Sequence, residues 1–257
     1  MDLLLNGKVA IVTGASRGIG RAIAQELAAE GMRLALAART QSELDSLAES
    51  LAVETLVHAA DLREAGAPQR LVAAAVERFG RLDLLVNNAG ATQRGDFLAL
   101  PDAAWEDGFA LKFYAAMRCC RAAWPHLIAS RGCVVNIVGV GGRTGSAEFA
   151  IGGAVNAALL NLTKVLADRG VADGVRVNAV NPGSIATERL TRRLRQTAAE
   201  MGGDEQAAAA AMLRGSRVAR FGEPAEIARA VAFLASPQAA YCQGAVLDVD
   251  GGATRTL

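Results

Sequence analysis

Three glycines near the start of the chain have a spacing that can hold a phosphate group. They lie in Thr13-Gly14-Ala15-Ser16-Arg17-Gly18-Ile19-Gly20, between a short apolar run and an amphipathic segment. Gly14 permits a tight turn, Gly18 lets the backbone approach a pyrophosphate, and Gly20 lets a helix pack closely on a strand. The N-terminus of that helix points free N–H groups at the phosphates. The segment predicts a dinucleotide site. A glycine-rich turn without a ligand is the alternative, which the motifs described below disfavour.

The second expected strand ends without the carboxylate that would bind the ribose 2′-hydroxyl of NAD. The chain reads Ala37-Ala38-Arg39-Thr40 there, so nothing repels a 2′-phosphate. Arg39 and Arg17 can both reach toward such a phosphate, and a guanidinium suits its geometry. NADP(H) is therefore favoured over NAD(H). The alternative is that Arg39 is an exposed loop residue with no ligand.

Patterns typical of buried strands and of amphipathic helices alternate along the chain. The apolar runs predict strands over 9–12, 34–38, 55–59, 82–87, 133–138, 175–180 and 245–249. The helical patterns cover 21–30, 42–51 with Ser42 as N-cap, 69–79, 105–128, 153–169 and 227–234. Strands without polar alternation, separated by helices, imply a parallel sheet covered on both faces. The prediction is a single α/β domain over 1–257, a Rossmann fold with a doubly wound seven-stranded parallel sheet and its ligand beyond the carboxyl ends of the strands.

Composition excludes several classes of function. A formal net charge of +1 argues against a nucleic-acid binder, and four cysteines without metal-type spacing argue against a zinc site. The N-terminal residues lack the pattern of a signal peptide, and no run looks long enough to span a bilayer. We therefore expect a cytoplasmic protein with reduced thiols, a small-molecule substrate, no metal, no nucleic acid and no membrane.

These motifs together resemble the classical short-chain dehydrogenase/reductase family over nearly the whole chain. The matching segments are Thr13–Gly20, Asp61-Leu62, Asn87-Asn88-Ala89-Gly90, Asn178, Asn181-Pro182-Gly183 with Ile185 and Thr187, and Asp248-Val249-Asp250-Gly251-Gly252. In the family, the pair at 61–62 contacts adenine and the segment from 181 to 187 holds the nicotinamide carboxamide. The resemblance implies an oxidoreductase with a variable substrate lid at about 187–223. It also implies a homotetramer or homodimer.

The four catalytic residues that the resemblance implies are all replaced. Family members use an Asn, a Ser, a Tyr that donates the proton and a Lys that grips the nicotinamide ribose. The matching positions here are Lys112, Gly139, Gly152 and Asn156. Loss of the general acid alone costs about 10²–10⁴ in rate. An ordinary ketone reductase with these replacements would be nearly inactive.

Lys112 and Asn156 have exchanged the residue types that the family places at these positions. In family members, the two side chains approach one cavity from adjacent helices. We hypothesise that Lys112 is the functional cation, against the alternative of a surface or interface lysine with no role in the site. Three functions stay open. They are an NADP(H)-dependent oxidoreductase acting on a small carbonyl, hydroxyl or activated substrate, an inactive NADP(H)-binding scaffold or sensor, and a non-redox enzyme that uses Lys112.

Four arginines lie early in the expected lid: Arg189, Arg192, Arg193 and Arg195. They could meet an anionic substrate such as a carboxylate. A solvated helix face is the commoner meaning of such a run.

Overall fold

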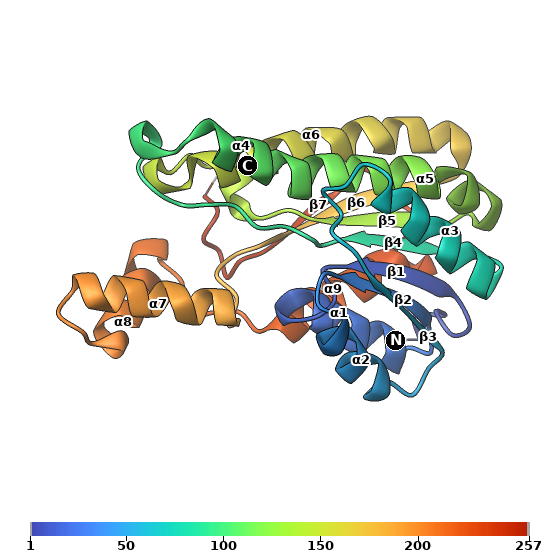
Figure 1. Cartoon of the computed structure of the whole chain (residues 1–257), viewed down its shortest axis with the longest axis horizontal. Coiled ribbons are helices and arrows are strands. Elements are labelled where there is room, and N and C mark those ends of the chain that lie inside the picture. The colour runs from blue at the N-terminus through green and yellow to red at the C-terminus, as the bar shows by residue number, and fades with distance from the viewer. Residues whose placement is uncertain (1, 256–257) are drawn as a thin grey trace.

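The computed structural model describes residues 2–255 and contains one parallel sheet of seven strands (Figure 1). The strand order is β3-β2-β1-β4-β5-β6-β7, so the chain winds outward in both directions from β1 and β4. The strands are β1 (Val9–Thr13), β2 (Arg33–Ala38), β3 (Thr55–Ala59), β4 (Leu84–Asn87), β5 (Cys133–Ile137), β6 (Arg176–Pro182) and β7 (Val246–Val249). Every residue of β1, β4 and β5 is buried, because helices cover both faces of the sheet. The predicted doubly wound fold is confirmed.

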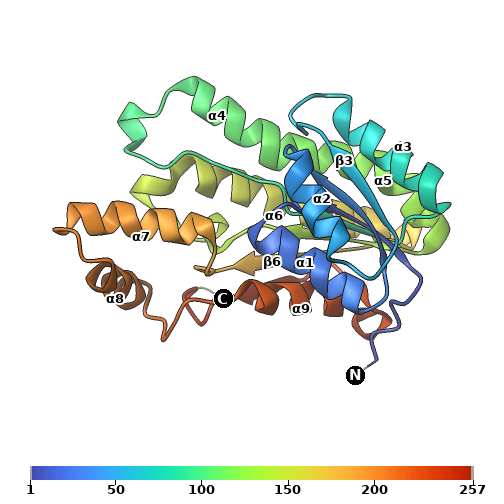
Figure 2. The same cartoon turned by 60° about the horizontal axis from the view of Figure 1, so that its bottom comes forward.

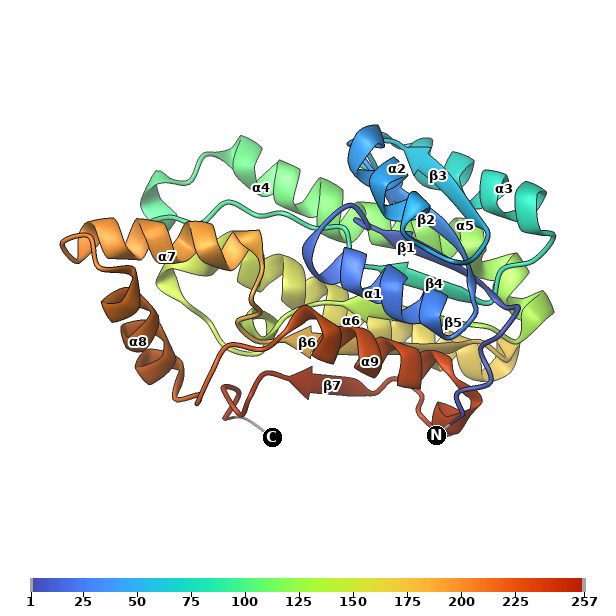
Figure 3. The ribbon, with the colours of Figure 1, turned by 90° about the horizontal axis from the view of Figure 1, so that it is seen from below.

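Two layers of helices cover the sheet. One face carries α1 (Gly18–Ala29), α2 (Gln41–Glu49) and α9 (Pro224–Ala235), and Figure 3 shows α1 and α9 side by side. The other face carries α3 (Ala67–Phe79), α5 (Ala115–Ser130) and α6 (Ala150–Asp173). Each layer buries its own apolar cluster, one around Leu27 and Leu44 and the other around Leu71 and Leu127.

Several helices start earlier than the sequence pattern predicts. α6 begins at Ala150 and α3 at Ala67, because their first turns carry glycine, alanine or proline and show no apolar periodicity. Ser42 is not an N-cap, since α2 begins at Gln41 and is preceded by Thr40, whose side chain caps nothing. The predicted helix over 105–128 is three consecutive pieces: α4 (Asp102–Phe109), a π-helical turn η2 (Ala110–Tyr114) and α5.

The residues expected to form a substrate lid make a helical hairpin. α7 (Glu188–Glu200) follows β6, α8 (Glu205–Ser216) packs against it, and both project away from the sheet (Figure 2). Asp204 caps α8 by accepting hydrogen bonds from the backbone N–H groups of Gln206 and Ala207, at 2.8 and 3.1 Å. The hairpin therefore extends the molecule beyond the carboxyl edge of the sheet.

One helical stretch, Ala147–Asp173, is long and apolar enough to cross a membrane by length and composition. The expectation that no run reaches this length is therefore wrong. Core helices pass the same test, and Ile151, Val155 and Leu159 of α6 are buried. The apolar composition of α6 follows in part from its packing against β6.

Candidate active site

The glycine-rich turn after β1 contacts two of the other segments predicted to bind the cofactor. A Cβ atom at Gly14 would lie 2.9 Å from Asn88 Nδ2, and one at Gly18 would lie 3.3 Å from Thr187 Cγ2. Both glycines have positive φ angles, 65° and 55°, which other residues rarely adopt. The segments at 14–20, 88–90 and 182–187 thus meet at the carboxyl edge of the sheet, as the sequence predicts.

Thr13 fixes this junction, a role that the sequence pattern did not suggest. Its Oγ1 donates to the carbonyl of Val86 at 3.1 Å and accepts from the N–H groups of Asn88 and Ala89 at 2.9 and 3.1 Å. The Asn88 side chain in turn donates to the carbonyls of Thr13 and Gly14. These bonds hold the turn after β1 to the segment after β4.

The turn has the shape that a dinucleotide pyrophosphate requires. A Cβ at Gly20 would lie only 2.1 Å from the Gly14 carbonyl oxygen, so no side chain fits there. Arg17 precedes α1 without capping it through its side chain, so within the described part of the chain the first N–H groups of the helix have no side-chain acceptor. Free N–H groups at a helix start favour an anion. The residues present therefore fit the predicted cofactor.

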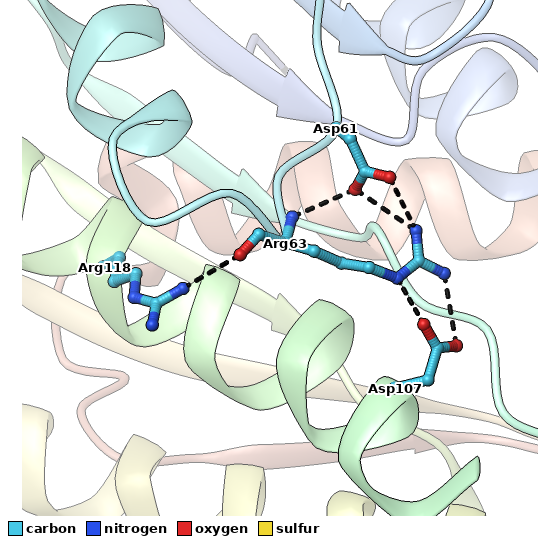
Figure 4. A network of polar contacts seen from close by, with 4 residues as sticks. All are labelled: Asp61, Arg63, Asp107 and Arg118. Atoms are coloured by element: carbon cyan, nitrogen blue, oxygen red, sulfur yellow. Dashed lines mark hydrogen bonds and ion pairs between the residues drawn. The ribbon is translucent and has the colours of Figure 1, made fainter. Parts of the chain in front are cut away.

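Arg63 organises the region predicted to receive the adenosine half (Figure 4). It donates to both carboxylate oxygens of Asp61 at 3.2 and 3.0 Å and to Asp107 of α4 at 2.5 and 3.2 Å. Burial alone would raise the pKa of Asp61, but hydrogen bonds from Arg63 and the charges of Arg63 and Arg39 lower it. Leu62 is buried, whereas Arg39 is exposed just beyond β2. The sequence pattern gave Arg63 and Asp107 no role.

Lys112 is half-buried beside the predicted site and is not a fully exposed surface residue. It belongs to the π-helical turn η2, a feature that often marks functional positions. Its side chain runs along Gly90, where a Cβ would lie 3.1 Å from Lys112 Cδ, and Nζ donates to the carbonyl of Val138 at 2.5 Å. Burial, and then the charge of Arg189, lower the pKa of Lys112 to about 7. Ammonium and amine forms are therefore both populated near neutral pH.

Asn156 approaches the same point from α6. A Cβ at Gly139, the residue after Val138, would lie 3.1 Å from Asn156 Nδ2. The Asn156 side chain is buried, and its Oδ1 has no hydrogen-bond partner among residues 2–255. Gly139 has φ of 132° and donates its N–H to Asn181 at 3.1 Å. Lys112 and Asn156 thus converge on the end of β5, although they come from different elements.

The space beside Gly152 is filled by another side chain. A Cβ at Gly152 would lie 2.1 Å from Phe149 Cζ, and one at Gly141 would lie 2.8 Å from Phe149 Cε1. The Phe149 ring therefore occupies the volume into which a residue at 152 would project. Sequence spacing could not show this, because Phe149 comes from the preceding 3-10 turn.

The segment after β6 closes the other side of the site. Pro182 ends β6, and Gly183 packs against Asp250, where a Cβ would lie 2.8 Å from its Cα. Ile185 is buried, and the segment continues directly into α7. Arg189 reaches back from α7 and donates to the Gly90 carbonyl at 2.6 Å. Lys112 and Arg189 therefore flank Gly90.

Comparisons with known proteins agree with this geometry. A family model described as enoyl-(acyl carrier protein) reductase matches residues 14–254. An uncharacterized oxidoreductase of Mycobacterium tuberculosis is 39% identical over 97% of this chain and 93% of its own length. A 3-oxoacyl-[acyl-carrier-protein] reductase of Vibrio cholerae is 36% identical over 96% of this chain and 98% of its own. The structure of L-sorbose reductase from Gluconobacter frateurii, complexed with NADPH and L-sorbose, superposes with a TM-score of 0.95 at 32% identity, with each chain covered completely.

Proposed function

The chain belongs to the short-chain dehydrogenase/reductase family of oxidoreductases, and we propose that it is an NADP(H)-dependent member with Lys112 as its catalytic cation. Its substrate would be a small carbonyl or hydroxyl compound, or an activated compound such as an iminium. When bound, the nicotinamide would supply or accept a hydride. The single observation that carries the proposal is the position of the Lys112 side chain, which runs along Gly90 and places Nζ on the Val138 carbonyl just beyond β5.

The preference for NADP(H) rests on the end of β2. No carboxylate follows Ala38, and the exposed Arg39 lies close enough to Asp61 for its charge to lower the Asp61 pKa. A ribose 2′-phosphate there would gain an arginine and meet no acidic residue at the β2 end. The L-sorbose reductase, which is similar over the whole chain, is described as complexed with NADPH.

Lys112 can take over the proton transfer that the family assigns to tyrosine. In the direction of reduction, its ammonium would give a proton to the carbonyl oxygen as the carbonyl carbon gains hydride, and the resulting amine would be reprotonated from solvent. A pKa of about 7 is suited to such an acid at neutral pH. The Val138 carbonyl holds Nζ at the end of β5, and the unpartnered Asn156 Oδ1 would accept a hydrogen bond from a bound hydroxyl group.

Cofactor binding is the first test, because it needs no knowledge of the substrate. Protein stripped of nucleotide is titrated with NADPH and NADH by calorimetry, alongside Arg39→Glu. We expect tighter binding of NADPH than of NADH, and loss of that preference in the variant. Equal affinity for both in the wild type would refute the NADP(H) assignment, and binding of neither would refute the oxidoreductase.

Catalysis is tested with NADPH and a panel of ketones, aldehydes and cyclic iminium ions. We expect turnover that falls about 10²–10⁴-fold in Lys112→Met, the scale of a lost general acid. Unchanged turnover in the variant would refute the role of Lys112. Tight NADPH binding without turnover of any compound would favour the second candidate, a non-catalytic NADP(H)-binding protein. The Phe149 ring at the tyrosine position is the observation that keeps this candidate open.

A further inference from the structure

Three arginines share one face of α7. Arg189, Arg192 and Arg193 are spaced i, i+3 and i+4, so their side chains leave the helix on the same side. This side faces the site, because Arg189 reaches the Gly90 carbonyl. Arg195 leaves elsewhere and pairs with Glu205 of α8 at 3.6 Å. α7 therefore carries three arginines on the side that faces the site, whereas Arg195 joins α7 to α8.

A fourth arginine meets this face from the loop after β4. The Arg94 guanidinium carbon lies 4.6 Å from the centre of the Phe149 ring. Burial and then the charge of Arg193 lower the pKa of Arg94, and Glu148 opposes them. The Gly95 N–H donates to the Glu148 carbonyl at 3.1 Å, which holds this loop against the turn that carries Phe149. Arg94 therefore lies over the ring that fills the tyrosine position, and the positive charge of Arg193 acts on it from α7.

These arginines have few nearby counter-charges, of which Glu148 beside Arg94 is one. Within residues 2–255, no carboxylate oxygen comes within ion-pair distance of Arg94, Arg189, Arg192 or Arg193. By contrast, Arg17 and Arg195 each have a glutamate partner, Glu188 and Glu205. Like charges that are not ion-paired repel one another, and a bound anion would relieve that repulsion.

We propose that Arg94 and Arg193 form a subsite for the carboxylate of the substrate, which places this protein among enzymes that act on small organic acids. The inference deepens the proposed function and rests on it. Stacking on Phe149 holds one face of the Arg94 guanidinium and leaves its N–H edge free for a bidentate bond. Arg193 would supply a second donor from α7. The remainder of the acid would extend from Phe149 toward Lys112, where its reacting carbon belongs.

The test compares carboxylic acids with their neutral amides. The probes are phenylacetate with phenylacetamide and 3-phenylpropanoate with 3-phenylpropanamide, titrated by calorimetry with and without saturating NADP⁺. The proteins are wild type, Arg94→Gln, Arg193→Gln and the matched control Arg195→Gln. NADPH affinity is measured separately for each protein, so a failure of the cofactor assignment is seen independently of the subsite.

We expect the acids to bind wild type at least about tenfold more tightly than their amides, the scale of one charge-assisted hydrogen bond. In Arg94→Gln and in Arg193→Gln, the affinities for acid and amide should differ by no more than about threefold, and the affinity for NADPH should be unchanged. Arg195→Gln should keep the wild-type ratio of acid to amide affinity. Equal binding of acid and amide, or no acid binding at all, would overturn the proposal. So would an equal loss in Arg195→Gln, because that result would show only the general positive charge of α7.

Discussion

Lys112→Met should stabilise the folded protein at pH 6 although it removes the proposed catalytic cation. Burial and the charge of Arg189 lower the pKa of Lys112 from 10.5 to about 7 in the folded state. Between these two values, the unfolded chain binds more protons than the folded chain, so the free energy of unfolding rises with pH. The wild type is therefore penalised most below pH 7. A methionine of similar length does not titrate and avoids the penalty.

The size of the effect follows from the two pKa values. A shift from 10.5 to about 7 corresponds to at most about 5 kcal/mol, at about 1.4 kcal/mol per unit. Two effects make the gain smaller than this upper limit. Solvent still reaches part of Lys112, and methionine cannot make the hydrogen bond to the Val138 carbonyl, which contributes about 1 kcal/mol. We therefore expect Lys112→Met to gain about 2–3 kcal/mol at pH 6. At pH 9, the difference in free energy of unfolding between Lys112→Met and the wild type should be smaller by about 2 kcal/mol.

Urea denaturation of wild type, Lys112→Met and Lys164→Met at pH 6 and pH 9 measures these differences. Lys164 is exposed on α6, so its variant should follow the wild-type pH dependence. The other titrating groups are common to all three proteins and cancel in the comparison. A difference between Lys112→Met and wild type that stays constant from pH 6 to pH 9 would refute the reasoning. Lys112 would then titrate like an ordinary lysine, and its role as a general acid near pH 7 would lose its physical basis.

Three further predictions concern the site and the assembly. Gly152→Tyr should lower the free energy of unfolding by about 1–3 kcal/mol and gain no turnover, because the new ring collides with Phe149. A variant as stable as the wild type would contradict this packing. Asp107→Ala should change the free energy of unfolding by about 1 kcal/mol or less, yet weaken NADPH binding several-fold, since Arg63 loses one of its two carboxylate partners. An unchanged affinity for NADPH would show that Arg63 has no part in cofactor binding. By family analogy we expect a homotetramer or homodimer through the outer faces of α5 and α6, where Val165 is 56% exposed. Mass photometry should show Val165→Glu shifted to smaller species, and a monomeric wild type would exclude this assembly.

The sequence alone determined the fold and the edge of the sheet that carries the site. Apolar runs and helical periodicity are local signals, and they placed all seven strands within about two residues. The glycine spacing at 14–20 also depends on local geometry, a tight turn followed by a helix start. Helix beginnings were less accurate, as at Ala150 and Ala67, because the alanine, glycine and proline of a first turn show no helical apolar periodicity even where the structure buries them.

The tertiary structure alone decided which distant side chains meet. Lys112 and Asn156 were aligned with two catalytic positions by spacing, but their convergence on Val138 and Gly139 depends on how η2 and α6 pack against β5. The same is true of Phe149, whose ring fills the space at Gly152, and of Arg63, which joins two elements far apart in sequence. Such contacts are set by the packing of whole elements, and no local pattern of residues encodes them.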